Sequence, residues 1–194
     1  MDERTPAVRR QLTVGVCVFT ALALLGAVLG VLWWALAPER AEGVALGGGE
    51  VFTGTDEALF AGEGAFVLVT ALTGLVTGYV VYMLQFLLAE RRAQDLRLAC
   101  LAAGFLGSAV GALLTWQVGT ALDAPLHAAL QEADRGETVT VGLQLRATAF
   151  LVAWPFVFVL QYGLLDAVSL LRRDQPGLPG RPAAPSAETA SDTP

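Results

Sequence analysis

Four long apolar runs constrain this chain more than any other feature of its sequence. An apolar run of about 20 residues is long enough to cross a bilayer as a helix. The mean hydropathy of +0.58 and the hydrophobic fraction of 55% are typical of a membrane protein. We therefore predict an all-α membrane protein, a bundle of four transmembrane helices. The predicted spans cover about residues 12–37, 64–88, 98–120 and 144–171.

The first run has a second interpretation, as a secretory signal peptide. Ala35-Leu36-Ala37 resembles a signal cleavage site. The run is longer than the usual apolar region of about 7–15 residues in a signal peptide, and more spans follow it. We therefore favour an uncleaved first span within a membrane domain that covers residues 12–172.

The arginines predict the orientation of the bundle. Nine of the twelve lie before the first span, between the second and third spans, or after the fourth. The two other loops, residues 38–63 and 121–143, together with the start of the fourth span hold three arginines and ten acids. Cytoplasmic segments carry the excess of basic residues. We therefore expect both termini in the cytoplasm, as a short segment (1–11) and a disordered tail (173–194) that is rich in proline and small residues.

The two outer loops are expected to form a small extracytoplasmic cap. Residues 43–46 and 50–53 flank three glycines, which predicts a short hairpin. Asp123 and Pro125 indicate the start of a short helix, and Gly136 its end. Residues 137–143 alternate polar and apolar side chains, a weak strand signal that could extend the hairpin into a sheet.

Glycines predict how the helices pack. Small residues let two helix backbones approach closely in lipid, where no hydrophobic effect drives helices together. We expect the first, second and third spans to pack through their glycine faces, with the third span as the hub. The predicted packing residues are Gly26, Gly30, Gly74, Gly78, Gly104, Gly107 and Gly111.

The second span carries the most polar membrane face, and it is the candidate route for transport. Glu63, Thr70, Thr77 and Gln85 fall on one arc of that helix. Glu63 could accept a proton or a cation, or it could be an interfacial carboxylate in water or paired with a neighbouring arginine.

Two residues of the fourth span, Asp166 and Pro155, also bear on whether the protein could transport an ion or a proton. Asp166 could relay protons if it is buried, or it could pair with Arg91 or Arg92 at the interface. Pro155 is expected to bend the helix near its middle, either as a simple kink or as a transport hinge.

Nothing in the sequence indicates catalysis, so we expect no catalytic residues, no metal and no cofactor. Cys17 and Cys100 lie near ends of apolar runs, and His127 stands alone in a loop. Asp56 and Glu57 could join Glu63 at a cation site, although adjacent acids at a helix start are more typical of capping. No basic aromatic patch suggests nucleic acid.

Several segments together resemble a family of small four-span actinobacterial membrane proteins that is classed as a domain of unknown function. The resemblance implies the same four-span topology and no assigned activity. The resembling segments are LWWALAP (32–38), the segment 56–60, GLVTG (74–78), GSAVGALLTWQVG (107–119) and RATAFLVAWP (146–155).

We therefore predict a non-enzymatic, multi-pass plasma-membrane protein, structural or accessory in role. It would act in the bilayer through helix or cap contacts with itself or with another membrane protein, in upkeep of the cell envelope. The alternative is a small oligomeric transporter or channel that uses the polar face of the second span.

Overall fold

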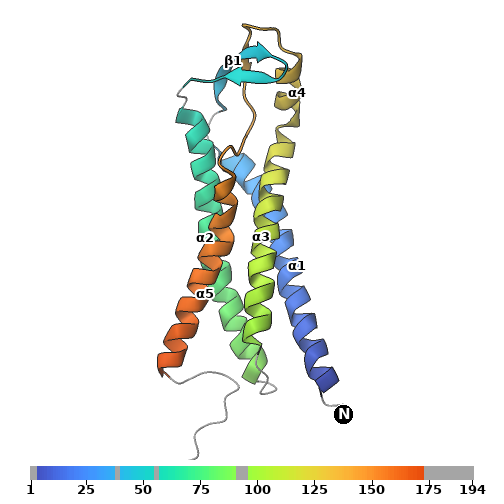
Figure 1. Ribbon diagram of the computed structural model, residues 1–194, viewed down its shortest axis with the longest axis vertical. Helices are drawn as coiled ribbons and strands as arrows, with labels where there is room; N and C mark the ends of the chain where they lie inside the picture. The colour runs from blue at the N-terminus through green and yellow to red at the C-terminus, as the bar shows by residue number, and fades with distance from the viewer. Residues whose placement is uncertain (1–3, 38–39, 55–56, 91–95, 173–194) are drawn as a thin grey trace, which may run out of the picture.

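Four helices run side by side along most of the molecule, with a small sheet at one end (Figure 1). The computed structural model describes residues 4–37, 40–54, 57–90 and 96–172. The start of the first helix and the end of the last are both at the end of the molecule opposite the sheet. The long helices are α1 (Arg4–Leu36), α2 (Glu57–Glu90), α3 (Arg97–Leu122) and α5 (Ala153–Arg172).

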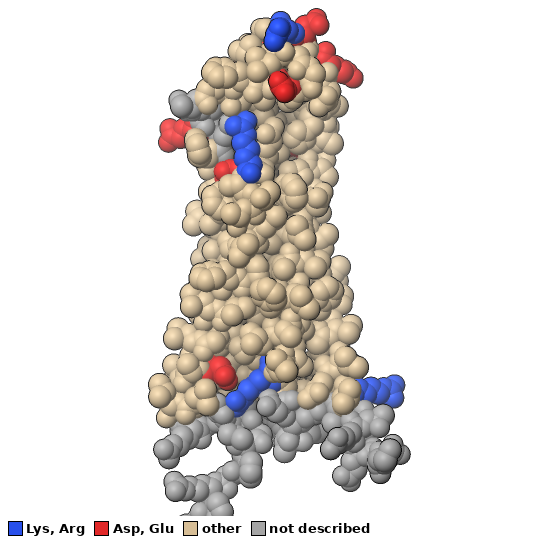
Figure 2. All heavy atoms as spheres, in the orientation of Figure 1, with Lys and Arg blue, Asp and Glu red and all other residues tan. Residues whose placement is uncertain are grey.

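Each of these helices contributes a segment that is long and apolar enough to cross a membrane, which confirms the predicted number of spans. Figure 2 shows charged side chains gathered towards the two ends of the molecule, with a broad uncharged band between them. Such a band is what the hydrocarbon core of a bilayer requires. By length and composition, the candidate spans are Val8–Leu36, Phe60–Leu88, Arg97–Leu122 and Thr148–Leu171.

The first close helix pair is α1 with α3. A Cβ atom on Gly26 would overlap the backbone of Gly111. The Thr115 hydroxyl donates a hydrogen bond to the Gly26 carbonyl oxygen at 3.0 Å, and Gly107 faces the backbone of Phe19. Small residues on both helices therefore allow direct backbone contact.

The second close pair is α2 with α5, and here the expected packing partner was wrong. A Cβ atom on Gly74 would lie 2.9 Å from the Trp154 carbonyl oxygen, and one on Gly78 would lie 2.9 Å from that of Phe158. The glycine face of α2 therefore lies against α5, not against α3. The reason is that the rings of Trp154 and Phe158 lie over Gly111 and Gly104 of α3 and occupy the space there.

The centre of the bundle is an aromatic column on α5. Trp154, Phe158 and Tyr162 recur every four residues, so they share one helix face, and each is at most 2% exposed. Val81 and Tyr82 of α2 belong to the same buried cluster. The column therefore joins the two helix pairs into one bundle.

The sheet and a short helix lie at the end of the bundle opposite the first described turn of α1 and the last of α5 (Figure 1), and we call them the cap. Strands β1 (Glu42–Gly47) and β2 (Glu50–Phe52) form the expected hairpin, and β3 (Thr138–Thr140) pairs antiparallel with β1. Helix α4 (Ala124–Glu132) lies between α3 and β3 in the chain. It ends before Gly136, which instead occupies a turn with φ of 93°.

The fourth span differs from the prediction at its start. Residues 144–147 have no regular structure, and a 3-10 turn, η1 (Thr148–Val152), precedes α5. Pro155 therefore lies in the first turn of α5, so the expected bend in the middle of a helix was wrong. Proline is tolerated in the first turn because the backbone N–H that it lacks would have no helical partner there.

Candidate functional site

The polar face of α2 is the first candidate site, and most of it is buried. Thr70 is 0% and Thr77 is 8% exposed. Their hydroxyls donate to the carbonyl oxygens one turn earlier, of Phe66 and Thr73, both at 2.7 Å. The Trp154 indole N–H of α5 also donates to the Thr77 hydroxyl oxygen, at 3.2 Å. The two threonines thus have their hydrogen bonds inside the protein, and α5 covers Thr77.

Gln85 lies farther along the same face and is 1% exposed. Its Oε1 accepts a hydrogen bond from the Tyr162 hydroxyl at 2.5 Å, and that hydroxyl also lies 3.2 Å from the Arg97 carbonyl oxygen. The Gln85 Nε2 atom has no hydrogen-bond partner among the residues that the structure describes. A buried donor without a partner typically costs about 1–3 kcal/mol.

Glu63 stands at the cap end of this face, where it binds main chain. Its Oε1 accepts hydrogen bonds from the backbone N–H groups of Arg146 at 2.6 Å and Ala147 at 3.1 Å. The carboxylate therefore holds the irregular segment that leads into η1. Asp56, its possible partner at a cation site, lies outside the described residues.

Asp166 lies in the C-terminal part of α5. Its Oδ1 atom is 3.7 Å from the Nε atom of Arg97, at the start of α3. Both side chains are partly buried, at 28% and 23% exposed. The pairing partners expected from the sequence, Arg91 and Arg92, lie outside the described residues. The Tyr162 hydroxyl, which donates to Gln85, lies beside the backbone carbonyl of Arg97.

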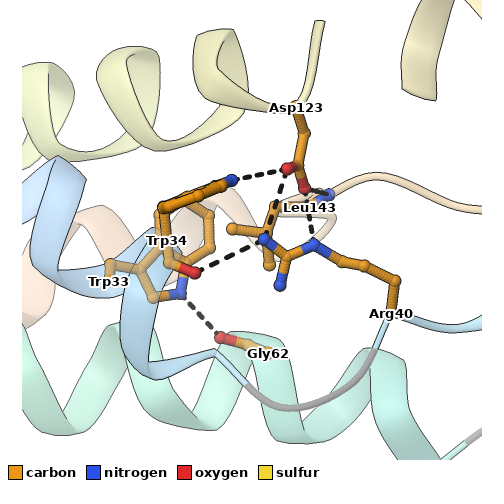
Figure 3. A network of polar contacts seen from close by, with 6 residues as sticks. All are labelled: Trp33, Trp34, Arg40, Gly62, Asp123 and Leu143. Carbon is orange, nitrogen blue, oxygen red and sulfur yellow. Dashed lines mark hydrogen bonds and ion pairs between the residues drawn. The ribbon is translucent and has the colours of Figure 1, made fainter. Parts of the chain in front are cut away.

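The most connected polar site was not a candidate from the sequence. Figure 3 shows Asp123, at the corner between α3 and α4, with hydrogen-bond donors from three other parts of the chain. Its carboxylate accepts from the Trp34 indole at 2.6 Å, from Arg40 Nε at 2.7 Å and from the Leu143 backbone N–H at 2.7 Å. Next to it, the Trp33 indole donates to the Gly62 carbonyl oxygen at 2.9 Å.

These contacts join α1, the segment before β1, the α3–α4 corner and the segment after β3. Burial of Asp123, which is 4% exposed, tends to raise its pKa. The hydrogen bonds from Arg40, Leu143 and Trp34 outweigh that effect, and the pKa of Asp123 lies below its ordinary value. A sequence signal was available, since Asp123 directly follows a charge-free span and Arg40 is the lone basic residue of the first loop.

The surface of the described part of the chain is hollowed at a groove and at a shallower depression, among other places. A groove of about 680 Å³ lies between the N-terminal parts of α1 and α3. Its lining is almost wholly apolar and includes Gly15 and Ala103. A shallow hollow of about 510 Å³ lies where α3, α4 and residues 143–145 meet. His127 lines the second hollow and packs against Gly142.

Potential metal ligands do not cluster in the described part of the chain, where no group of three His, Cys, Asp or Glu side chains could hold an ion. Cys17 is exposed on α1, and Cys100 is buried in the bundle.

No protein-family model, curated protein or solved structure matches this chain. Its function must therefore be argued from the sites themselves.

Proposed function

We propose that this chain is a non-enzymatic, multi-pass plasma-membrane protein that acts through contacts of its helices or cap, with itself or with another membrane protein. Both termini would lie in the cytoplasm and the cap outside the cell. The arginine distribution supports this orientation, since nine of the twelve arginines lie in the sequence before the first predicted span, between the second and third, or after the fourth. A role as an accessory component of the cell envelope follows from that placement.

The packing of the α2 polar face is the observation that carries the proposal. A transport route along this face would need room for water or an ion beside Thr70, Thr77 and Gln85. Instead, the three side chains are at most 8% exposed, and Trp154 donates a hydrogen bond to Thr77. The backbone of α5 also lies against Gly74 and Gly78. These contacts favour a helix interface over a conduit.

The cap supports the same proposal. Asp123 links four segments of the chain near the cap, and Glu63 of α2 binds the last of these, after β3, at Arg146 and Ala147, so hydrogen bonds anchor the cap on the helices. A rigid outer surface suits a protein that presents a binding face.

Purification from the native membrane in mild detergent, with mass spectrometry of the intact particle, tests the proposal. A stoichiometric second protein, or a homo-oligomer that conducts no ions in liposomes, is the expected result. A homo-oligomer that carries ion flux would overturn it in favour of transport.

The transport alternative has an observation of its own: the Nε2 atom of buried Gln85 has no hydrogen-bond partner within the described part of the chain. Gln85→Leu separates the two functions. If α2 only packs, the variant should retain its partner and its stability to within about 1 kcal/mol, because it removes one hydrogen bond together with one unsatisfied donor. If α2 conducts, flux in liposomes should fall while the fold is kept, and Glu63→Gln should have the same effect.

A further inference from the structure

One face of the three-stranded sheet exposes apolar side chains. Val44 and Leu46 of β1 are each 41% exposed, and Phe52 of β2 is 64% exposed. Val44 and Phe52 are direct cross-strand partners, so their side chains stand on the same face. The pairing shifts register between Ala45 and Gly47, but exposed and buried residues still alternate along β1. Leu46 is exposed like Val44, on the side away from buried Ala45. We call these three residues the apolar cap face.

The opposite face of the sheet is already covered. Gly43 and Ala45 alternate with the exposed residues of β1 and are buried. Helix α4 contacts β2 and β3, and the side chain of Gln131 on α4 lies against Gly49 in the hairpin turn. The part of the chain that the structure describes thus packs against one face of the sheet and leaves the apolar cap face open.

Lipid does not explain this exposure. Many helix residues are equally exposed, such as Leu68 and Leu72 of α2, but they lie within a predicted span where acyl chains cover them. The sheet lies beyond the ends of the long helices (Figure 1). Apolar side chains in such a place are typical of a contact surface for another protein.

The charges around the apolar cap face indicate what kind of partner fits. Glu42 and Glu50 are exposed and each lies two residues before an apolar member, so both carboxylates border the face. A second copy docked through the same face would place four carboxylates around one interface, and an anionic membrane surface would be repelled. A basic partner with apolar side chains would bind through the apolar residues of the face and would also be attracted by the two carboxylates.

We infer that the apolar cap face binds a segment of a different protein, one that presents apolar side chains flanked by lysine or arginine. The inference rests on the proposed function, since it names the partner chemistry of the cap. The apolar side chains would supply buried area, and Glu42 and Glu50 would select the basic partner and speed its association.

The test places the photocrosslinking residue benzoylphenylalanine at position 52 of the full chain in native membranes. We expect one discrete adduct to another protein. Its yield should fall about tenfold when both bordering charges are reversed, as in E42R/E50R, and should weaken as salt is raised. Glu132→Arg reverses an exposed acid on α4, away from this face, and is the matched control that should leave the adduct unchanged.

Several results would overturn the inference: an adduct with the mass of a dimer of this chain, lipid adducts alone, or a protein adduct indifferent to E42R/E50R. Val44→Ser removes an apolar side chain from the face and should also lower the adduct yield. A thermal unfolding curve for each variant shows whether a lower yield comes from a lost contact or from an unfolded protein. If the intact particle keeps a second protein while position 52 gives no protein adduct, the proposed function survives and this inference fails. If the wild-type particle carries ion flux and no partner, the proposed function itself fails.

Discussion

Asp123 illustrates how a single carboxylate can organise the junction between a membrane helix and a cap. It is almost fully buried, and its oxygens accept hydrogen bonds from Trp34, Arg40 and the Leu143 backbone. Charge burial is costly unless the charge is paired and hydrogen-bonded. Here both conditions are met by residues far apart in the chain, so the buried charge depends on contacts that only the folded protein brings together.

Asp123→Ala should destabilise the protein by about 3–5 kcal/mol, because the Arg40 guanidinium and the Leu143 N–H would lose their acceptor. The thermal unfolding midpoint, followed by tryptophan fluorescence in mild detergent, measures the effect, and Trp34 lies directly at the site. Glu132→Ala, which removes an exposed acid from α4, should change stability by no more than about 0.5 kcal/mol. Equal effects of the two variants would contradict the role given to Asp123.

The same carboxylate predicts how stability depends on pH. Its pKa in the folded protein lies below the ordinary value of 3.8, so the folded state favours the ionised form. Its contribution is therefore fully present above pH 3.8 and is lost as the pH falls below that value through the folded-state pKa. Unfolding midpoints measured from pH 6 downward should show this loss in the wild type, and Asp123→Asn should lack that component.

The helices form two close pairs, and glycine sets the closeness of each. Gly26 and Gly111 bring the backbones of α1 and α3 together, and Gly74 and Gly78 do so for α2 and α5. Rings from α5 then fill the space beside the α3 glycines. The same residue type therefore has two uses in this bundle, backbone contact and room for an aromatic ring.

Gly26→Leu should separate α1 from α3 and cost at least about 1–3 kcal/mol, because its Cβ atom alone would overlap the Gly111 backbone. Gly163→Ala is the matched control on α5, where an added Cβ atom meets nothing within 4 Å. That change should stabilise the helix by up to about 1 kcal/mol. Unfolding midpoints in the same detergent compare the two, and a neutral Gly26→Leu would show that α1 and α3 do not pack this way.

The face of the molecule in Figure 2 has an uncharged middle and charged side chains towards both ends. The cap lies at one end and the described chain starts and stops at the other (Figure 1). The two ends of the bundle should therefore face opposite sides of the bilayer. We propose that the end opposite the cap faces the cytoplasm, because nine of the twelve arginines lie in the sequence segments expected on that side.

Cysteine labelling in intact cells checks this orientation, in a background where Cys17 and Cys100 are replaced by alanine. Thr138→Cys, exposed on β3, should react with a membrane-impermeant maleimide added outside. Arg9→Cys, exposed on α1, should react only after the membrane is opened. The reverse pattern would invert the proposed topology.

The number of spans, their approximate limits and the cap hairpin could all be predicted from the amino-acid sequence. Each of these features depends on a local free energy, either of placing a charge in lipid or of a backbone conformation. Such a free energy can be judged without knowing which residues meet in the fold. A charge in lipid is unfavourable wherever it lies, and three successive glycines turn the chain because each adopts a positive φ without strain, at 90°, 67° and 82°.

The pairing of the helices and the Asp123 site depended on which side chains meet in three dimensions. Gly74 and Gly78 could have packed against either α3 or α5, and the volumes of Trp154 and Phe158 over the α3 glycines decided for α5. From the sequence alone, Asp123 is predicted only to start a helix. In the structure, Trp34, Arg40 and the Leu143 backbone N–H come from distant segments and all donate hydrogen bonds to it. Shape complementarity and convergence are properties of the assembled fold, because each depends on residues that sequence order keeps far apart.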